Sequence, residues 1–379
     1  MNRKSILWGL VLVSVFGSVA VAGAAQKEQP KKAEAAAKAP AARWDAVLQA
    51  AKGEGSLIVY STANPATKLA LTKAMKEKYG IAVDFIIGRG EQLVQRIYME
   101  NQAGIYQGDV LLVGGTTLQL TLKPGYTSNL DSVLILPEVA DPTRWRGQRI
   151  PFLDKDHQII GFVNKSGSYV AVNTDAIKPG EIKSFRDLTD PKWKGKIIMD
   201  DPTITGAADD WAHLMLVIFG HEKGKEYLQQ LAKQDLVVLR DKRLVVEWLA
   251  RNKYPIAIGP DAQTYSEFRS NGAPIAYIKM SEGSGSTSSG GCISILKRAA
   301  HPNASLVFLN WLLTREGQTI FQKSFGAPSA RVDVDLTGMD PGFIPQEGEK
   351  LFSAMSAEWY ASKAAGMEVV NQIFKPLMK

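Results

Sequence analysis

The stretch Ser56–Val113 decides the fold: "SLIVYSTANPATKLALTKAMKEKYGIAVDFIIGRGEQLVQRIYMENQAGIYQGDVLLV". Three short runs rich in β-branched residues, 56–60, 81–87 and 109–113, have the length and composition of buried strands. Amphipathic segments separate them, and Asn64-Pro65 has the form of a helix N-cap followed by proline at the first helical position. This alternation predicts a doubly wound α/β sheet with parallel strands.

The rest of the chain repeats this pattern. Further strands are expected at "KIIM" (196–199), "LVVL" (236–239), "PIAIG" (255–259) and "GCISI" (291–295), and one apolar helix is expected over 302–318. A single sheet would be large for so many units in a chain of 379 residues, so the sequence favours two α/β lobes.

The N-terminus has the form of an export signal. Arg3 and Lys4 make the first residues basic, 6–21 are apolar, and small residues follow in "AVAGAAQ". The apolar run is shorter than the roughly 20 residues that span a bilayer. We therefore expect a cleavable signal peptide at 1–24 and export to the periplasm. The stretch 25–42, rich in Ala, Lys and Pro, is expected to be a flexible linker.

Composition and motifs exclude several classes of function. The net charge is +7, but Lys and Arg alternate with acids and are not gathered on one face, so no nucleic-acid partner is expected. The single cysteine, Cys292, cannot form an intramolecular disulfide. The four histidines have no metal-ligand spacing, and no nucleophile elbow or phosphate-binding P-loop is present. We therefore predict no catalytic residues, no metal and no cofactor.

One motif recurs at four strand ends. Small or hydroxylated residues precede an expected helix start at 61–64, 88–90, 114–117 and 203–207. Ligands of open α/β sheets bind at the carboxyl ends of strands, and the free backbone N–H groups of a helix start attract anions. Any helix start requires residues of this kind as caps, so one such stretch alone does not indicate a binding site. Four of them together predict a binding cleft.

The stretches "GRGEQLVQRI" (88–97), "DLTDPKWKGKI" (187–197) and "FLNWLLTREGQ" (308–318) resemble periplasmic solute-binding proteins of ABC importers, in the branch that includes ferric-iron carriers. The resemblance implies a type 2 periplasmic binding fold, with two α/β lobes joined by two crossover strands and a ligand held between them. Lobe 1 would comprise 43–168 and 277–379, and lobe 2 would comprise 169–276. The resemblance also implies a monomer that delivers its solute to a permease in the inner membrane.

The ferric ligands of that branch do not match this chain. Ferric ion requires anionic oxygen ligands, which this branch supplies with two adjacent tyrosines, a His and a Glu. Asn64 stands at the position of the His, Gly115 at that of the Glu, and 260–263 at that of the tyrosine pair. The sequence therefore favours a small organic anion, such as a carboxylate, phosphate ester or phosphonate.

Arg89 is the natural anion-binding group, because its guanidinium forms a planar fork and the flanking glycines allow a ligand to approach the backbone. The alternative is that Arg89 is an exposed surface residue that pairs with Glu91 or another surface acid and binds no ligand. The predicted ligand-binding residues are Ser61, Thr62, Asn64, Arg89, Thr116, Thr117, Thr205, Gly206, Ala207, Asp261 and Gln263. A ferric carrier, a periplasmic enzyme on the same fold and a sensory binding protein remain alternatives.

Overall fold

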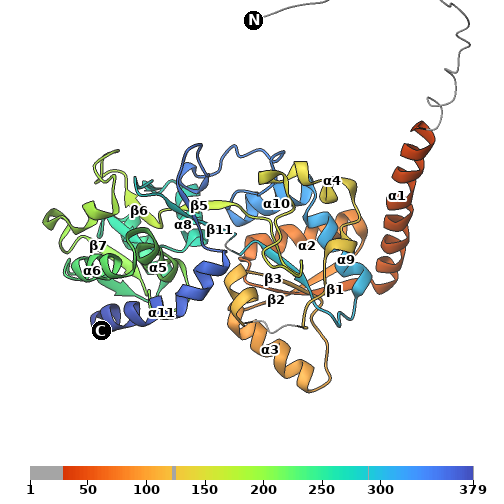
Figure 1. Cartoon of the computed structure of the whole chain (residues 1–379), viewed down its shortest axis with the longest axis horizontal. Helices are drawn as coiled ribbons and strands as arrows, with labels where there is room; N and C mark the ends of the chain where they lie inside the picture. Colours follow the sequence, from red (N-terminus) through yellow and green to blue (C-terminus); the bar gives the residue numbers. More distant parts are fainter. Residues whose placement is uncertain (1–28, 122–124, 289, 379) are drawn as a thin grey trace, which may run out of the picture.

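A computed structural model of the chain describes residues 29–121, 125–288 and 290–378 (Figure 1). The first of its two large sheets forms where the opening stretch predicts it. The strands β1 (Ser56–Ser61), β2 (Ala82–Ile87) and β3 (Val110–Val113) pair in parallel. The strand β12 (Cys292–Ile295) runs antiparallel to both β3 and β4 (Ile160–Gly161), and these two strands complete the order β2-β1-β3-β12-β4.

The second sheet has the order β10-β6-β9-β7-β8 within the described residues. Its strands are β6 (Val170–Asn173), β7 (Ile197–Asp200), β8 (Val237–Leu239), β9 (Ile256–Ile258) and β10 (Ile275–Tyr277). A small connecting sheet lies between the two lobes and consists of β5 (Lys165–Gly167), β11 (Ser284–Thr287) and β13 (Leu351–Ser353). Since β5 follows a strand of the first sheet and precedes one of the second, while β11 returns the chain, these two strands are the predicted crossovers.

The helices divide between the lobes, as Figure 1 shows. Those beside the first sheet are α1 (Gln29–Glu54), α2 (Pro65–Tyr79), α3 (Gly90–Gln102), α4 (Pro137–Ala140), α9 (Pro302–Leu312) and α10 (Arg315–Phe325). Those of the second lobe are α5 (Ala207–Phe219), α6 (His221–Ala232), α7 (Lys242–Ala250), α8 (Ala262–Ser270) and α11 (Ala357–Phe374). No described helix is long and apolar enough to cross a bilayer.

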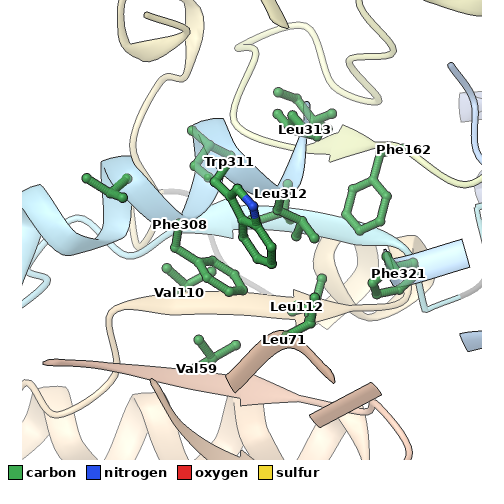
Figure 2. Packing of buried hydrophobic residues seen from close by; sticks show 14 of the residues in the cluster. Val59, Leu71, Val110, Leu112, Phe162, Phe308, Trp311, Leu312, Leu313 and Phe321 are labelled. Atoms are coloured by element: carbon green, nitrogen blue, oxygen red, sulfur yellow. The ribbon is translucent and has the colours of Figure 1, made fainter. Parts of the chain in front are cut away.

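Each lobe has its own apolar core. Figure 2 shows Phe308 and Trp311 of α9 above Val59 of β1 and Val110 of β3. All four are fully buried, and burial of such side chains contributes about 1.5–3 kcal/mol each. The second core gathers around α5 and β7, where Trp211 is fully buried.

Three stretches differ from expectation. The helix expected over 302–318 is two helices, because the Thr314 side chain accepts a hydrogen bond from the Gly317 N–H and starts α10. The expected linker is helical from Gln29, since Ala, Lys and Glu are strong helix formers. The C-terminal helix α11, assigned to lobe 1 from the sequence, packs against α5 and α6 through residues such as Trp359 and Val370. The expected signal peptide lies outside the described residues.

Candidate functional site

On the first sheet, the carboxyl ends of β1 and β3 lie side by side. The Ser61 hydroxyl donates to the Leu112 carbonyl (2.9 Å) and accepts from the Ala63 N–H (3.0 Å), so it ties these two ends together. Half-buried Thr62 also bonds Leu112 through its backbone N–H. The Asn64 side chain caps α2 by accepting from the Thr67 N–H (2.7 Å). The side chains of Ser61 and Asn64 therefore form hydrogen bonds with the backbone of this region and hold the strand end and the helix start in place.

The turn before α3 contains the Gly-Arg-Gly sequence. A Cβ atom on Gly90 would overlap the Thr117 side chain, whereas Gly88 faces only the flexible side chain of Leu93 at 3.3 Å. Gly90 therefore allows the start of α3 to approach the loop that follows β3. Arg89 itself is exposed. The structure thus brings this turn and Thr117 together without enclosing the guanidinium.

The loop after β3 meets the C-terminal segment. A Cβ atom on Gly115 would overlap Met355, which precedes α11. The half-buried Thr116 hydroxyl forms a hydrogen bond with Tyr360 of α11. Because α11 packs on the second lobe, these contacts connect the end of β3 in lobe 1 to lobe 2.

On the second sheet, the start of α5 carries three of the predicted residues. Thr205 is exposed, Gly206 precedes the helix and Ala207 begins it, packed on the second core. The buried Asp209 carboxylate lies in the first turn of α5, so a negative charge of the chain itself already adjoins this helix start. Asp200, at the end of β7, lies opposite Gly206, at 3.8 Å from a Cβ atom placed there.

Burial raises the pKa of two carboxyls in this region. The pKa of Asp200 is raised to about 6 by burial. That of Asp209 is raised to about 7 by burial and by the neighbouring Asp210. The Lys363 ammonium of α11 lies 3.0 Å from Asp209 and 2.5 Å from Asp210, and it is itself only 5% exposed. Lys363 thus joins α11 to the start of α5 through a buried triad of charges.

The loop after β9 occupies the position of the missing tyrosine pair. Asp261 caps α8 by accepting from the Thr264 N–H (3.0 Å), and its other oxygen lies 3.5 Å from the Lys242 ammonium. Burial opposes ionisation of Asp261, but Lys242 and Thr264 hold its pKa below the usual value. Gln263 is half-buried on α8. Asp261 is therefore primarily a helix cap, with its charge already compensated.

Two residues of the crossover segment were not predicted as site residues. Lys165 on β5 is 7% exposed, and burial lowers its pKa to about 8. Tyr169 is buried, adopts a left-handed backbone (φ 58°), and has a hydroxyl without a hydrogen-bond partner in the described part of the chain. In sequence, "NKSGSYV" has Tyr169 and Val170 as its strand formers, so its poverty in β-branched residues was the one local signal of a special role.

The arrangement provides two half-sites and a connection between them. Hydroxyl groups and helix starts lie at the ends of β1 and β3, while carboxylates and the start of α5 lie at the ends of β7 and β9. No group of three or more His, Cys, Asp or Glu side chains among the described residues is placed to hold a metal ion. A cavity of about 330 Å³, lined by Glu100, Tyr106 and Arg298 among others, lies near the amino end of β3, away from these half-sites.

A family model described as "Bacterial extracellular solute-binding protein" matches residues 70–344. A protein of Haemophilus influenzae described as uncharacterized is 26% identical over 286 residues, which cover 73% of this chain and 78% of that protein. Iron uptake protein A1 of Synechocystis is 28% identical over 157 residues, 41% of this chain and 40% of that protein.

Solved structures share the fold. The periplasmic binding protein AfuA of Actinobacillus pleuropneumoniae, with fructose-6-phosphate bound, superposes with a TM-score of 0.64 at 22% identity, covering 85% of this chain and 98% of that one. Iron-bound HitA of Pseudomonas aeruginosa gives 0.64 at 19% identity, covering 84% and 99%. Both confirm the predicted two-lobed fold class. Because the family model spans most of the chain, this protein belongs to the family of bacterial extracellular solute-binding proteins.

Proposed function

We propose that the protein captures a small organic anion in the periplasm, a carboxylate, phosphate ester or phosphonate, and delivers it to a membrane permease. The observation that carries this proposal is the placement of strand ends and helix starts from both lobes around the crossover strands. A ligand bridging the two halves binds the closed form better than the open form, and this difference in affinity drives closure.

The charges of the region favour an anion. Three carboxylates of this region have cations of their own: Lys363 pairs with Asp209 and Asp210 at the start of α5, and Lys242 pairs with Asp261 after β9. The positions of the ferric ligands are used otherwise, since Asn64 caps α2 and Met355 covers Gly115. AfuA, a structural neighbour, was solved with a sugar phosphate, which is consistent with this class of ligand.

A thermal-shift screen of the exported chain tests the proposal. Small carboxylates, phosphate esters, phosphonates, amines and ferric citrate would be compared, followed by calorimetric titration of any hit. A true ligand at one hundred times its Kd stabilises by about 2.7 kcal/mol. We expect one anion class to stabilise the protein with a stoichiometry of one and without turnover. Stabilisation by ferric ion alone would favour the iron-carrier alternative, and turnover of the hit would favour an enzyme.

Arg89 remains a proposed ligand residue. Its exposed guanidinium adjoins the start of α3, so Arg89→Ala is expected to weaken binding of the hit without changing stability. Lys73→Ala is the matched control, because Lys73 is an exposed cation in the middle of α2 with 69% of its side chain accessible. Equal affinities of the two variants would assign Arg89 to the solvated surface.

A further inference from the structure

Lys165 is a buried cation of the segment that crosses between the lobes. It lies on crossover strand β5 and is 7% exposed, with its ammonium 3.9 Å from the ring centre of Phe343 and 5.6 Å from that of Tyr277. Lysines are almost never so deeply buried unless they are paired. No described residue forms an ion pair or hydrogen bond with this ammonium. The chain therefore maintains a buried positive charge in contact with aromatic rings alone.

The nearby acids do not serve as its counter-ion. The carboxylates whose charges act on Lys165 are those of Asp261, Asp340 and Asp210. Each has a closer cation: Lys242 at 3.5 Å from Asp261, Arg269 at 3.2 Å from Asp340 and Lys363 at 2.5 Å from Asp210. These acids hold Lys165 in an attractive field, but their ion pairs are made elsewhere. The position next to the ammonium is left for a negative group from outside the chain.

Tyr169 provides an independent observation four residues further along the same segment. Its ring packs on Gly285 of β11, where an added Cβ atom would lie 2.8 Å from the ring. Gly285 is paired with Gly167 of β5, so the absence of a side chain at Gly285 makes room for the ring on the crossover strands. The Tyr169 hydroxyl is buried and lacks a partner within the described chain. A buried phenol normally finds a hydrogen-bond partner, so this one also points to a missing ligand.

Lys165 and Tyr169 belong to one neighbourhood. Lys165 pairs with Thr287 on β11, and the Tyr169 ring packs on Gly285, two residues earlier on the same strand. One unpaired ammonium and one unpaired phenol therefore flank the ends of β7 and β9 where the chain crosses between lobes. An ammonium and an O–H donor together complement a carboxylate or a phosphate.

We propose that Lys165 and Tyr169 bind the acidic group of the solute, Lys165 as its counter-ion and Tyr169 as a hydrogen-bond donor. This inference rests on the proposed capture of an organic anion and assigns its charged end to the crossover strands. The remainder of the solute then extends toward the helix starts of the two lobes. The anion is thus recognised at the junction between the halves.

The competing explanation is structural, with the lysine stabilising the fold through its contact with Phe343. The two explanations predict opposite effects of Lys165→Met. A buried charge without a counter-ion destabilises a fold, so its replacement by an apolar side chain of similar length raises the melting temperature if the charge serves a ligand. Lys279→Met is the matched control, because Lys279 is paired with Glu349 at 2.9 Å near the same strands. That variant leaves a carboxylate unpaired and lowers the melting temperature.

Two binding measurements complete the test. In calorimetry with the anion identified by the screen, Lys165→Met weakens binding by about thirtyfold or more, and Tyr169→Phe weakens it by about tenfold, without loss of stability. In NMR of protein labelled at lysine Cε, inorganic phosphate serves as the probe. It shifts the Lys165 signal, assigned by its loss in Lys165→Met, and raises the pH midpoint of that signal. The Lys279 signal stays in place.

The outcomes separate this inference from the proposed function. If wild-type protein binds a screened anion and Lys165→Met binds it equally well, the inference is wrong and the proposed function stands. If no screened solute binds but phosphate moves the Lys165 signal, the anion site is supported and the proposed solute class is not. A melting temperature lowered in Lys165→Met as much as in Lys279→Met, with an unmoved signal, overturns the inference outright.

Discussion

Gly259 is the residue that allows the two ligand-side elements of the second lobe to approach each other. It follows β9 with a left-handed backbone (φ 65°), and its N–H donates to the Tyr169 carbonyl at 2.7 Å. A Cβ atom at this position would lie 2.5 Å from both the backbone nitrogen and the Cα of Ala208, in the first turn of α5. These are backbone atoms, so they cannot rotate away as a flexible side chain would.

Two costs add in Gly259→Ala. The left-handed conformation disfavours an L-residue by about 1–2 kcal/mol, and overpacking against a fixed neighbour adds about 1–3 kcal/mol. The expected loss in the free energy of unfolding is therefore about 2–5 kcal/mol. Gly272 is the matched control in the same lobe, since it is also left-handed (φ 87°) but has no atom within 4 Å of an added Cβ. Gly272→Ala should therefore lower the free energy of unfolding only by the cost of the left-handed conformation, about 1–2 kcal/mol.

Urea unfolding followed by tryptophan fluorescence measures the difference. With an m-value of about 3 kcal/mol/M, the midpoints of the two variants should differ by about 0.3–1 M. Binding supplies a second readout: displacement of α5 and of the backbone of Tyr169 should weaken affinity in Gly259→Ala and leave it unchanged in Gly272→Ala. Equal midpoints and equal affinities would refute the close approach of the β9 loop to α5.

Three further predictions test buried charges of the second lobe and of crossover strand β5. Asp200→Asn should stabilise the protein at pH 7.5 by about 3 kcal/mol, because burial raises its pKa from 3.8 to about 6 and disfavours the ionised form in the fold. In the wild type, the fold favours protonated Asp200, and this contribution is complete below pH 3.8 and lost as pH rises through about 6. Calorimetric scans should therefore show that Asp200→Asn is no more stable than the wild type at pH 3.5. Lys363→Met should lose about 3–5 kcal/mol in urea unfolding, since it leaves Asp209 and Asp210 buried without a cation; an unchanged midpoint would contradict the triad. Burial lowers the pKa of Lys165 from 10.5 to about 8, so the unfolded state binds more protons between these values. Wild-type stability should therefore rise by about 3 kcal/mol relative to Lys165→Met from pH 8 to pH 10.5, and parallel pH profiles would contradict it.

The sequence predicted most of the strands and helices because these elements depend on nearby residues. The strand–helix alternation of 56–113 and the Asn64-Pro65 helix start depend on periodicity and capping, and the structure confirms them. The break between α9 and α10 was missed, although Thr314 is a helix cap, because apolar residues continue across it. The partner of α11 could not be predicted, since its apolar face fits either lobe and the choice depends on long-range contacts such as Lys363 with Asp209.

The site was less predictable, for a physical reason. A sequence shows which residues begin helices, and Asn64 and Asp261 do so, but capping and ligand binding favour the same residue types. The burial of Lys165 depends on Tyr277 and Phe343, which are more than a hundred residues away in sequence. Arg89 stood out in the sequence because glycines flank it, yet Gly90 is required by its contact with Thr117. Local patterns therefore located the edge of the sheets, while the charged groups there depend on tertiary packing.

The C-terminal segment links the two half-sites and so takes part in any closure. Lys363 fixes α11 to the start of α5, whereas Tyr360 and Met355 contact Thr116 and Gly115 at the end of β3. A ligand that reaches the backbone of Gly115 has to displace Met355, whose unbranched side chain has the flexibility to move. Under the proposed function, that displacement would release a contact between the lobes and so couple ligand binding at β3 to their relative position through α11. The affinity for solute therefore includes the free energy of moving this segment, and it depends on residues that do not touch the ligand.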